Sequence, residues 1–164
     1  MKSSCEGPGL PWPLRTRSAL VAAALLLFLG GCRAPDSTPE SVAREVWKAA
    51  LTGAADKLRS LYPTEAELKT LFEPEMAARF WGLLQTALGK LPDPARAPKV
   101  EILEVQIERE VDVPAGGGLK MASRFAKARV RMKVIWAESD DEMALVRIGQ
   151  RWRALPKEAL KFLQ

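Results

Sequence analysis

The side chains that most often carry out chemistry are scarce in this 164-residue chain. It has no histidine, two cysteines and a single tyrosine, Tyr62. The absence of histidine excludes the commonest general base, the commonest zinc ligand and the usual switch near neutral pH. Two cysteines cannot build a disulfide framework or a four-thiolate metal site. We therefore expect no catalytic residue, no metal site and no cofactor, and we interpret Tyr62, which precedes Pro63, as a packing residue.

One row of basic side chains is a candidate for binding an anionic partner. Arg129, Arg131 and Lys133 alternate with apolar residues, so a strand would place all three on one face, and Arg147 could extend the row. Such a row can attract the phosphates of lipopolysaccharide or an anionic wall polymer. The alternative, which we favour, is that glutamates of a neighbouring strand neutralise the row. Those glutamates are Glu104, Glu108 and Glu110.

Three further patterns have a structural interpretation beside a functional one. The acidic run Asp140-Asp141-Glu142 lacks the alternating oxygen ligands of a calcium loop, which favours an acidic hairpin tip. The run Gly116-Gly117-Gly118 lies between two expected strands, which indicates a hairpin and not a phosphate-binding loop. Four tryptophans could line a cavity for an apolar ligand, although core packing is the favoured interpretation. They are Trp47, Trp81, Trp136 and Trp152.

The first 31 residues are typical of an export signal. Lys2, Arg15 and Arg17 precede an uninterrupted apolar run from Ala19 to Leu29, and two glycines follow. A basic start, a short apolar core and small residues at its end form a secretory signal peptide. The run is shorter than the roughly 20 residues that a membrane-spanning helix needs.

The tetrad Leu29-Gly30-Gly31-Cys32 is similar to the lipobox of bacterial lipoproteins. The resemblance implies that the Cys32 thiol is diacylated, that the chain is cut before it and that the new amino terminus is acylated. Two or three acyl chains would anchor the protein stably in a membrane. The alternatives are an ordinary export signal with an incidental cysteine and an uncleaved anchor.

The lipobox implies a location in the bacterial cell envelope, with the membrane as a partner through Cys32. Arg33 follows the cysteine, whereas an aspartate there favours the inner membrane in enteric bacteria, so the outer membrane is favoured. The expected organisation is a signal peptide over residues 1–31, the lipidated cysteine and a tether over 32–38, and one domain over 39–164. Removal of residues 1–31 takes away three bases and one acid and lowers the net charge from +5 to +3. That charge predicts no nucleic-acid partner.

The residues between Thr38 and Lys90 recur with a helical period. Pro39 opens a first helix that Gly53 ends, and a capping box of Ser37 with Glu40 would support its start. Further helices are expected over 55–61, after a capping box of Thr64 with Glu67, and from Pro74 to Gly89. Residues 89–98 contain three prolines, which predicts a surface connection without a helix.

After Lys99 the apolar period becomes two, which predicts a pair of antiparallel strands on either side of the glycine run. The apolar residues are odd-numbered on the first strand and even-numbered on the second, so opposed residue numbers should have an odd sum. A sum near 237 would place Leu103 opposite Val134 and Glu104 opposite Lys133. The acidic residues 138–142 would then form a turn, followed by strands over 143–148 and 151–155 and a last helical turn after Pro156.

These elements predict an α+β domain in which N-terminal helices pack on one face of a curved antiparallel sheet of about four strands. The order resembles the nuclear-transport-factor-2-like (cystatin-like) fold over residues 39–155, through three stretches. They are Pro39 to Trp47, Gly53 to Leu58, and Ile148-Gly149-Gln150-Arg151-Trp152. The resemblance implies a cone with a cavity, found in enzymes, binding modules and assembly domains. Its enzymes commonly use an Asp–His pair or a Tyr with an Asp, and no such residue can be carried over here.

The favoured function is that of a lipid-anchored envelope protein with a non-catalytic domain that binds a protein, a lipid or a glycan. The alternative is a lipid-anchored enzyme that uses carboxylates alone, such as a glycan-cleaving hydrolase. That chemistry needs two carboxyl groups facing one cleft. The acids of this chain are expected on helix surfaces or beside bases on the strands, which favours the binding domain.

Overall fold

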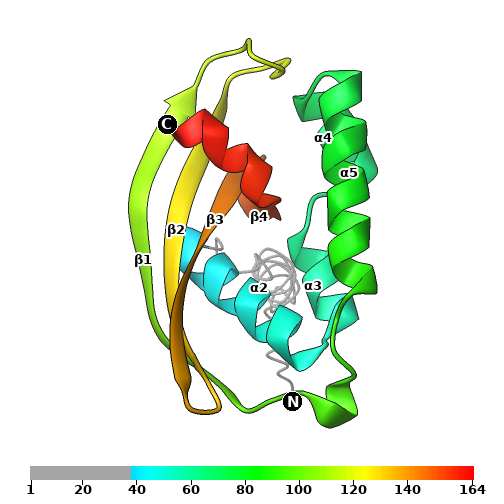
Figure 1. Cartoon of the computed structure of the whole chain (residues 1–164). Coiled ribbons are helices and arrows are strands. Elements are labelled where there is room, and N and C mark those ends of the chain that lie inside the picture. The colour runs from blue at the N-terminus through cyan, green and yellow to red at the C-terminus, as the bar shows by residue number, and fades with distance from the viewer. Residues whose placement is uncertain (1–37) are drawn as a thin grey trace, which may run out of the picture. The chain divides into compact units, whose positions relative to one another are not determined.

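The computed structural model describes residues 38–164, which belong to one compact unit. The predictions for residues 1–37, including the signal peptide and the lipobox with Cys32, lie outside the described residues. Figure 1 shows helices first and then an antiparallel meander, so the predicted α+β class is confirmed. The helices are α2 (Pro39–Thr52), α3 (Ala55–Leu61), α4 (Glu65–Leu71) and α5 (Pro74–Gly89).

Local sequence determines where these helices begin and end. Thr38 is the N-cap of α2 in place of the predicted capping box of Ser37 with Glu40, and the Thr38 hydroxyl oxygen accepts a hydrogen bond from the Ser41 N–H at 3.2 Å. Gly53 ends α2 in the left-handed conformation, with φ at 70°. The predicted capping box of Thr64 with Glu67 opens α4, and the Thr64 N–H donates to the Glu67 carboxylate at 2.7 Å. The predicted helix limits are therefore largely confirmed.

The connection over residues 89–98 contains a short helix that the prolines did not predict. The 3₁₀ helix η1 (Pro94–Arg96) has Pro94 at its start, where the missing N–H is not needed. The Asp93 carboxylate caps it by accepting from the Ala95 N–H at 3.0 Å. A single turn of helix is thus compatible with this proline-rich segment.

The sheet has four antiparallel strands in the order β1-β2-β3-β4. They are β1 (Val100–Val113), β2 (Ser123–Val134), β3 (Ala137–Ile148) and β4 (Arg151–Leu155). The long strands β1, β2 and β3 are curved, and the sheet does not close on itself (Figure 1). Residues 114–122, with the three glycines, connect β1 to β2, which confirms the predicted glycine hairpin.

The pairing of β1 with β2 differs from the predicted register. Two β-bulges, at Leu103 and Glu108, interrupt β1, so the sum of opposed residue numbers changes from 234 to 235 and then 236. Val134 lies opposite Val100 instead of Leu103. Leu103 is 40% exposed, and Ile102 packs against the core in its place. Each bulge adds one residue and reverses the side-chain alternation, which a strict period of two cannot reproduce.

The acidic run 138–142 belongs to β3, so the predicted turn there is wrong. Val134 pairs with Ala137, which leaves the two residues Ile135 and Trp136 as the turn between β2 and β3. The acids face basic residues of β2 across the strands, and this pairing keeps them in extended structure. Trp136 accordingly lies in the turn and not on the apolar face of β2.

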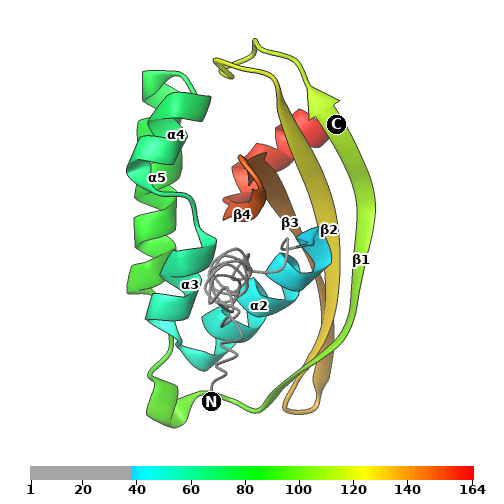
Figure 2. The same ribbon diagram turned by 180° about the vertical axis from the view of Figure 1, so that it is seen from behind.

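Apolar clusters cover both faces of the sheet. The α2 cluster joins Val46 and other residues of α2 to alternate residues of the strands, including Val130 and Leu145. The η2 cluster lies on the opposite residues of β2 and β3, including Phe125 and Val146, beneath the 3₁₀ helix η2 (Lys157–Leu163). Figures 1 and 2 show α2 and η2 on opposite faces. The expectation that helices cover only one face is therefore corrected, because Phe125 and Val146 make the second face apolar as well.

Aromatic rings and backbone hydrogen bonds join α4 and α5 to the sheet. The Phe162 ring centroid lies 5.3 Å from that of Phe125 and 5.8 Å from that of Phe72. The loop 114–122 reaches the same place, where the Glu73 N–H donates to the Gly118 carbonyl at 2.9 Å. The upper end of the sheet in Figure 1 is thus fastened to the helices.

Candidate functional site

The basic row of β2 lies between two acidic rows, one on each neighbouring strand. Arg129 Nη2 is 2.7 Å from Glu108 Oε1 and 3.6 Å from Glu142 Oε1. Lys127 Nζ lies 3.0 Å from Glu108 Oε2 and 2.9 Å from Glu142 Oε1. We call the whole set the charge ladder; its members are Glu104, Glu108, Lys127, Arg129, Arg131, Asp140 and Glu142. The charge ladder lies on the same face of the sheet as η2, in the part that η2 does not cover. Its β2 residues alternate with the β2 residues of the α2 cluster, which places them on the opposite face from α2.

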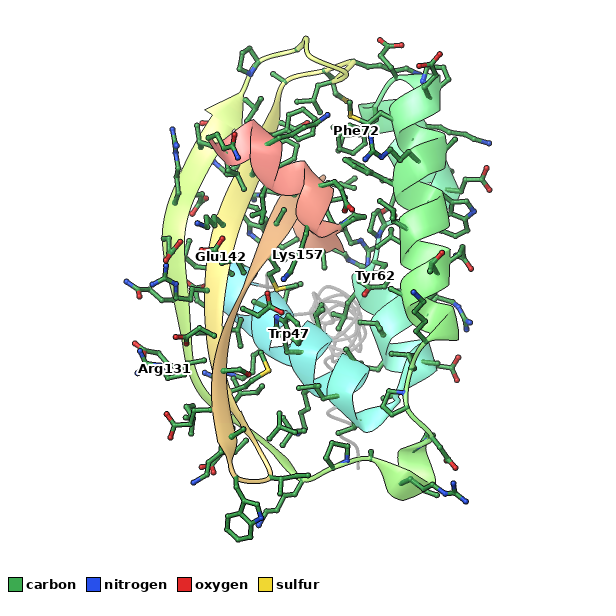
Figure 3. The ribbon with its side chains drawn as sticks, viewed as in Figure 1. Trp47, Tyr62, Phe72, Arg131, Glu142 and Lys157 are labelled. Carbon is green, nitrogen blue, oxygen red and sulfur yellow. The ribbon has the colours of Figure 1, made fainter. Side chains whose placement is uncertain are left out.

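The three predicted candidates differ in their surroundings. Arg131 lies within 3.6 Å of Glu104 and 3.4 Å of Asp140, and Figure 3 shows it pointing away from the helices. Arg129 is paired as described above. Lys133 lies opposite Glu101 and Glu138 in the register, yet it takes part in no ion pair among residues 38–164. The favoured interpretation of a neutralised row thus describes Arg129 and Arg131, which pair with Glu108 and Glu104, but not Lys133. The third expected glutamate, Glu110, pairs with Arg124 outside the row.

The electrostatics of the charge ladder favour its ionised form. The hydrogen bond from Lys127 lowers the pKa of Glu142, and the hydrogen bond to Glu142 in turn raises the pKa of Lys127. A carboxylate with a lowered pKa carries no proton at neutral pH, so Glu142 is unsuited to act as a general acid. An anionic ligand would have to displace carboxylates that already hold the arginines. The ladder is therefore a poor site for an anion.

Arg147 does not extend the basic row. It lies on β3 at a position that alternates with the ladder residues Asp140 and Glu142, which places it on the other face. It lines a separate hollow of about 240 Å³ together with Glu67 and Arg124. The expected contribution of Arg147 is wrong because its strand position has the opposite parity.

An ion pair outside the charge ladder joins β4 to α4. Arg153 Nη2 lies 3.4 Å from Glu67 Oε1, and the two side chains are 15% and 27% exposed. Burial acts to raise the pKa of Glu67, but hydrogen bonds from Thr64 and the charge of Arg153 together lower it. Because Glu67 also completes the capping box of α4, this pair fastens an edge strand to a helix start.

Tyr62 and the tryptophans do not form a common site. Tyr62 is half-buried against both apolar clusters, and burial raises its pKa, so its hydroxyl keeps the proton at neutral pH. Trp47 and Trp152 belong to the α2 cluster, whereas Trp81 packs against the η2 cluster. Trp136 is 91% exposed. The favoured interpretation of core packing therefore describes Trp47, Trp81 and Trp152 but not Trp136, and within residues 38–164 the four tryptophans do not line a common cavity.

The hollows on the described residues have mixed charge. One of about 530 Å³ is lined by Met76 and Phe80 together with both acids and bases, including Glu158 and Lys161. Another, of about 510 Å³, lies between the charge ladder and Lys157, which forms an ion pair with Asp141. Within residues 38–164 no three His, Cys, Asp or Glu side chains gather as a metal site would require. The hollow of about 530 Å³ has three glutamates in its lining, Glu73, Glu75 and Glu158, together with Arg79 and Lys161.

The turn between β2 and β3 is the feature that the sequence reasoning missed, and we call Ile135 and Trp136 the hairpin tip. Ile135 is 59% exposed and has φ at 58°, the only left-handed non-glycine residue among residues 38–164. Its N–H donates to the Lys99 carbonyl at 3.3 Å. An open hollow of about 340 Å³ adjoins it. The lining is Lys99, Glu101, Lys133, Ile135 and Trp136.

A charge pattern in the sequence could have located this turn. Opposite charges are arranged symmetrically about residues 135 and 136, with Arg131 paired to Asp140 and Arg129 to Glu142. Antiparallel strands with this turn bring each base opposite an acid, whereas a turn over 138–142 leaves the acids unpaired. The alternation of apolar residues continues as far as Trp136, and for this reason the sequence pattern extended the strand through Trp136 and predicted the turn after it.

Among the described residues, no helix has the length and apolar character needed to cross a membrane. Comparisons of the chain with protein-family models, with curated proteins and with solved structures found no match.

Proposed function

We propose that the protein is a bacterial envelope lipoprotein, anchored by acyl chains on Cys32, whose residues 39–164 form a non-catalytic binding or assembly domain. The observation that carries the proposal is the Leu29-Gly30-Gly31-Cys32 tetrad directly after a basic and apolar export segment. Arg33 in place of an aspartate favours the outer membrane. The order of helices followed by a curved four-stranded meander supports a nuclear-transport-factor-2-like domain.

The charge distribution supports a non-catalytic role more than a hydrolase that uses carboxylates alone. Such a hydrolase needs one protonated carboxyl group and one free carboxylate facing the same cleft. On the sheet, Glu108, Asp140 and Glu142 are each bound to a base. A binding or assembly role requires no such pair.

The test is metabolic labelling of the full chain with a fatty-acid analogue in a bacterial host. We expect the wild-type protein to incorporate the label and to sediment with the outer-membrane fraction, and Cys32→Ser to lose both properties. Cys5→Ser is the matched control, because Cys5 lies inside the segment that would be removed. Labelling of Cys32→Ser at the wild-type level would overturn the proposal.

A further inference from the structure

The hairpin tip has residues that its turn geometry disfavours. A two-residue turn with positive φ only at its first central position is of type II′, where glycine is preferred. Ile135 occupies that position with φ at 58°, whereas the loop at the other end of β2 has glycines at all its positive-φ positions. A β-branched residue in this conformation is strained. Folding alone therefore does not account for Ile135.

The tip also exposes the largest apolar side chain of its neighbourhood. Trp136 is 91% exposed and Ile135 is 59% exposed, directly side by side. Both residues are unfavourable in water, and tryptophan is the residue most typical of the boundary between a bilayer and water. The strain and the exposure thus occur at the same two residues, which indicates contact with something outside the domain.

The charged groups around the tip are suited to lipid headgroups. Lys99 and Lys133 line the adjoining hollow together with Glu101, and Glu138 lies opposite Lys133 on β3. Neither lysine takes part in an ion pair among residues 38–164, in contrast to the bases of the charge ladder. Long lysine side chains beside an inserted apolar residue can extend their ammonium groups to phosphates at the membrane surface.

The proposed anchor would hold the domain within reach of the bilayer. Residues 33–38 separate Cys32 from the start of α2 and span at most about 20 Å when extended. Arg44 of α2 donates a hydrogen bond to the Ile102 carbonyl at 3.3 Å, and Ile102 pairs with Met132, three residues before the tip. The second turn of α2 therefore reaches the part of β1 that pairs with the last residues of β2 before the tip.

We propose that Ile135 and Trp136 form a second membrane contact that inserts into the interfacial region of the bilayer and orients the domain. This inference rests on the anchoring through Cys32 proposed above. A lipid surface fits better than a protein partner, because two side chains offer at most about 400 Å², about half of what one partner contributes to a specific protein interface. Interfacial insertion requires no larger surface.

The test uses matched single cysteines at the two ends of the sheet. Cys5 would be removed with the signal and Cys32 would be acylated, so an introduced cysteine is the only free thiol of the mature chain. Ala137→Cys beside the tip and Ala115→Cys in the loop 114–122 both replace an exposed alanine. Each full-length lipidated variant is labelled with an environment-sensitive fluorophore. It is then reconstituted into protein-free vesicles of equal parts phosphatidylethanolamine and phosphatidylglycerol.

We expect the probe at position 137 to shift its emission to the blue and to be quenched by lipids that carry a spin label near the headgroup. The probe at 115 should show neither effect. Adding Trp136→Asn to Ala137→Cys should reduce both effects at least severalfold. Unshifted emission at 137 in a protein that floats with the vesicles would overturn the tip contact and leave the anchor standing.

Two other outcomes also contradict the proposal. A blue shift at 137 in native envelopes but not in protein-free vesicles would identify a protein partner in place of lipid. Failure of the Ala115→Cys protein to float with the vesicles would overturn the anchoring itself, and with it the inference that depends on it. Circular dichroism of each variant, compared with the wild type, shows that the fold is retained.

Discussion

The two turns that flank β2 differ in almost every respect. The loop 114–122 has three glycines in a row, and its Gly118 receives a hydrogen bond from the start of α5. The hairpin tip has no glycine, is strained at Ile135 and exposes Trp136. The first turn is built from residues that its backbone requires and is packed against helices. The second exposes residues that its backbone disfavours, which is expected for the membrane contact proposed above.

The largest expected difference is between the two aromatic residues that lie beside these turns. Phe125, two residues into β2, is fully buried, whereas Trp136 is 91% exposed. We expect Phe125→Ala to lower the free energy of unfolding by about 3–5 kcal/mol, because it leaves a cavity in the η2 cluster. Trp136→Ala should change it by less than about 0.5 kcal/mol. Urea denaturation followed by circular dichroism measures both, and equal losses would remove the contrast.

The glycines of the loop 114–122 provide the next test. A Cβ on Gly118 would lie 2.1 Å from the Met76 side chain, and φ at this residue is 100°. We expect Gly118→Ala to cost about 2 kcal/mol, mainly because alanine is strained at a φ of 100°, while the flexible end of the Met76 side chain has to move aside. Gly117→Ala is the matched control, with φ at 59° and open space around it, and should cost about 1 kcal/mol. Identical thermal midpoints for the two variants would show that the packing against Met76 is unimportant.

At the hairpin tip we expect a substitution to stabilise the domain. Ile135→Gly should raise the free energy of unfolding by about 1 kcal/mol, because glycine adopts positive φ without the penalty of a β-branched residue. The same variant should weaken the proposed membrane contact. Differential scanning calorimetry gives the stability, and a lower melting temperature for Ile135→Gly would mean that Ile135 packs within the domain.

The smallest change in stability is expected from pH, which affects the charge ladder but not the η2 cluster. The pKa of Glu142 is lowered in the folded protein, so the ionised carboxylate stabilises the fold at neutral pH. This stabilisation is lost as the pH falls through the pKa of Glu142 in the folded state. We expect Glu142→Gln to lower the thermal midpoint slightly at pH 7 and to match the wild type in strong acid. The effect is small because the pair is exposed to solvent. A difference that persists unchanged at pH 2 would contradict the ionic explanation.

Short-range signals explain why the helices were predictable. Gly53, the capping box of Thr64 with Glu67, and Pro74 each determine a helix limit through residues within one turn, and the structure places the limits there. The β2 and β4 strands were predictable for a similar reason, because alternation and turn residues are local.

The register of β1 with β2 and the position of the hairpin tip depend on the curvature of the sheet, so local sequence signals could not predict them. The bulges at Leu103 and Glu108 allow β1 to turn its apolar residues toward the α2 cluster at one end and the η2 cluster at the other. No local rule predicts which residue becomes the extra one. Among the candidate site residues, Arg129 and Arg131 were correctly expected to have acidic neighbours, but the acids of β3 were assigned to a turn.

The bulges of β1 have a further consequence, because β1 is an edge strand with no fifth strand beside it. An uninterrupted 14-residue edge would offer a row of free N–H and C=O groups on which another chain could extend the sheet. The two bulges break the spacing of that row. The irregular strand is thus a poorer template for edge-to-edge pairing between copies of the protein than a regular strand of the same length.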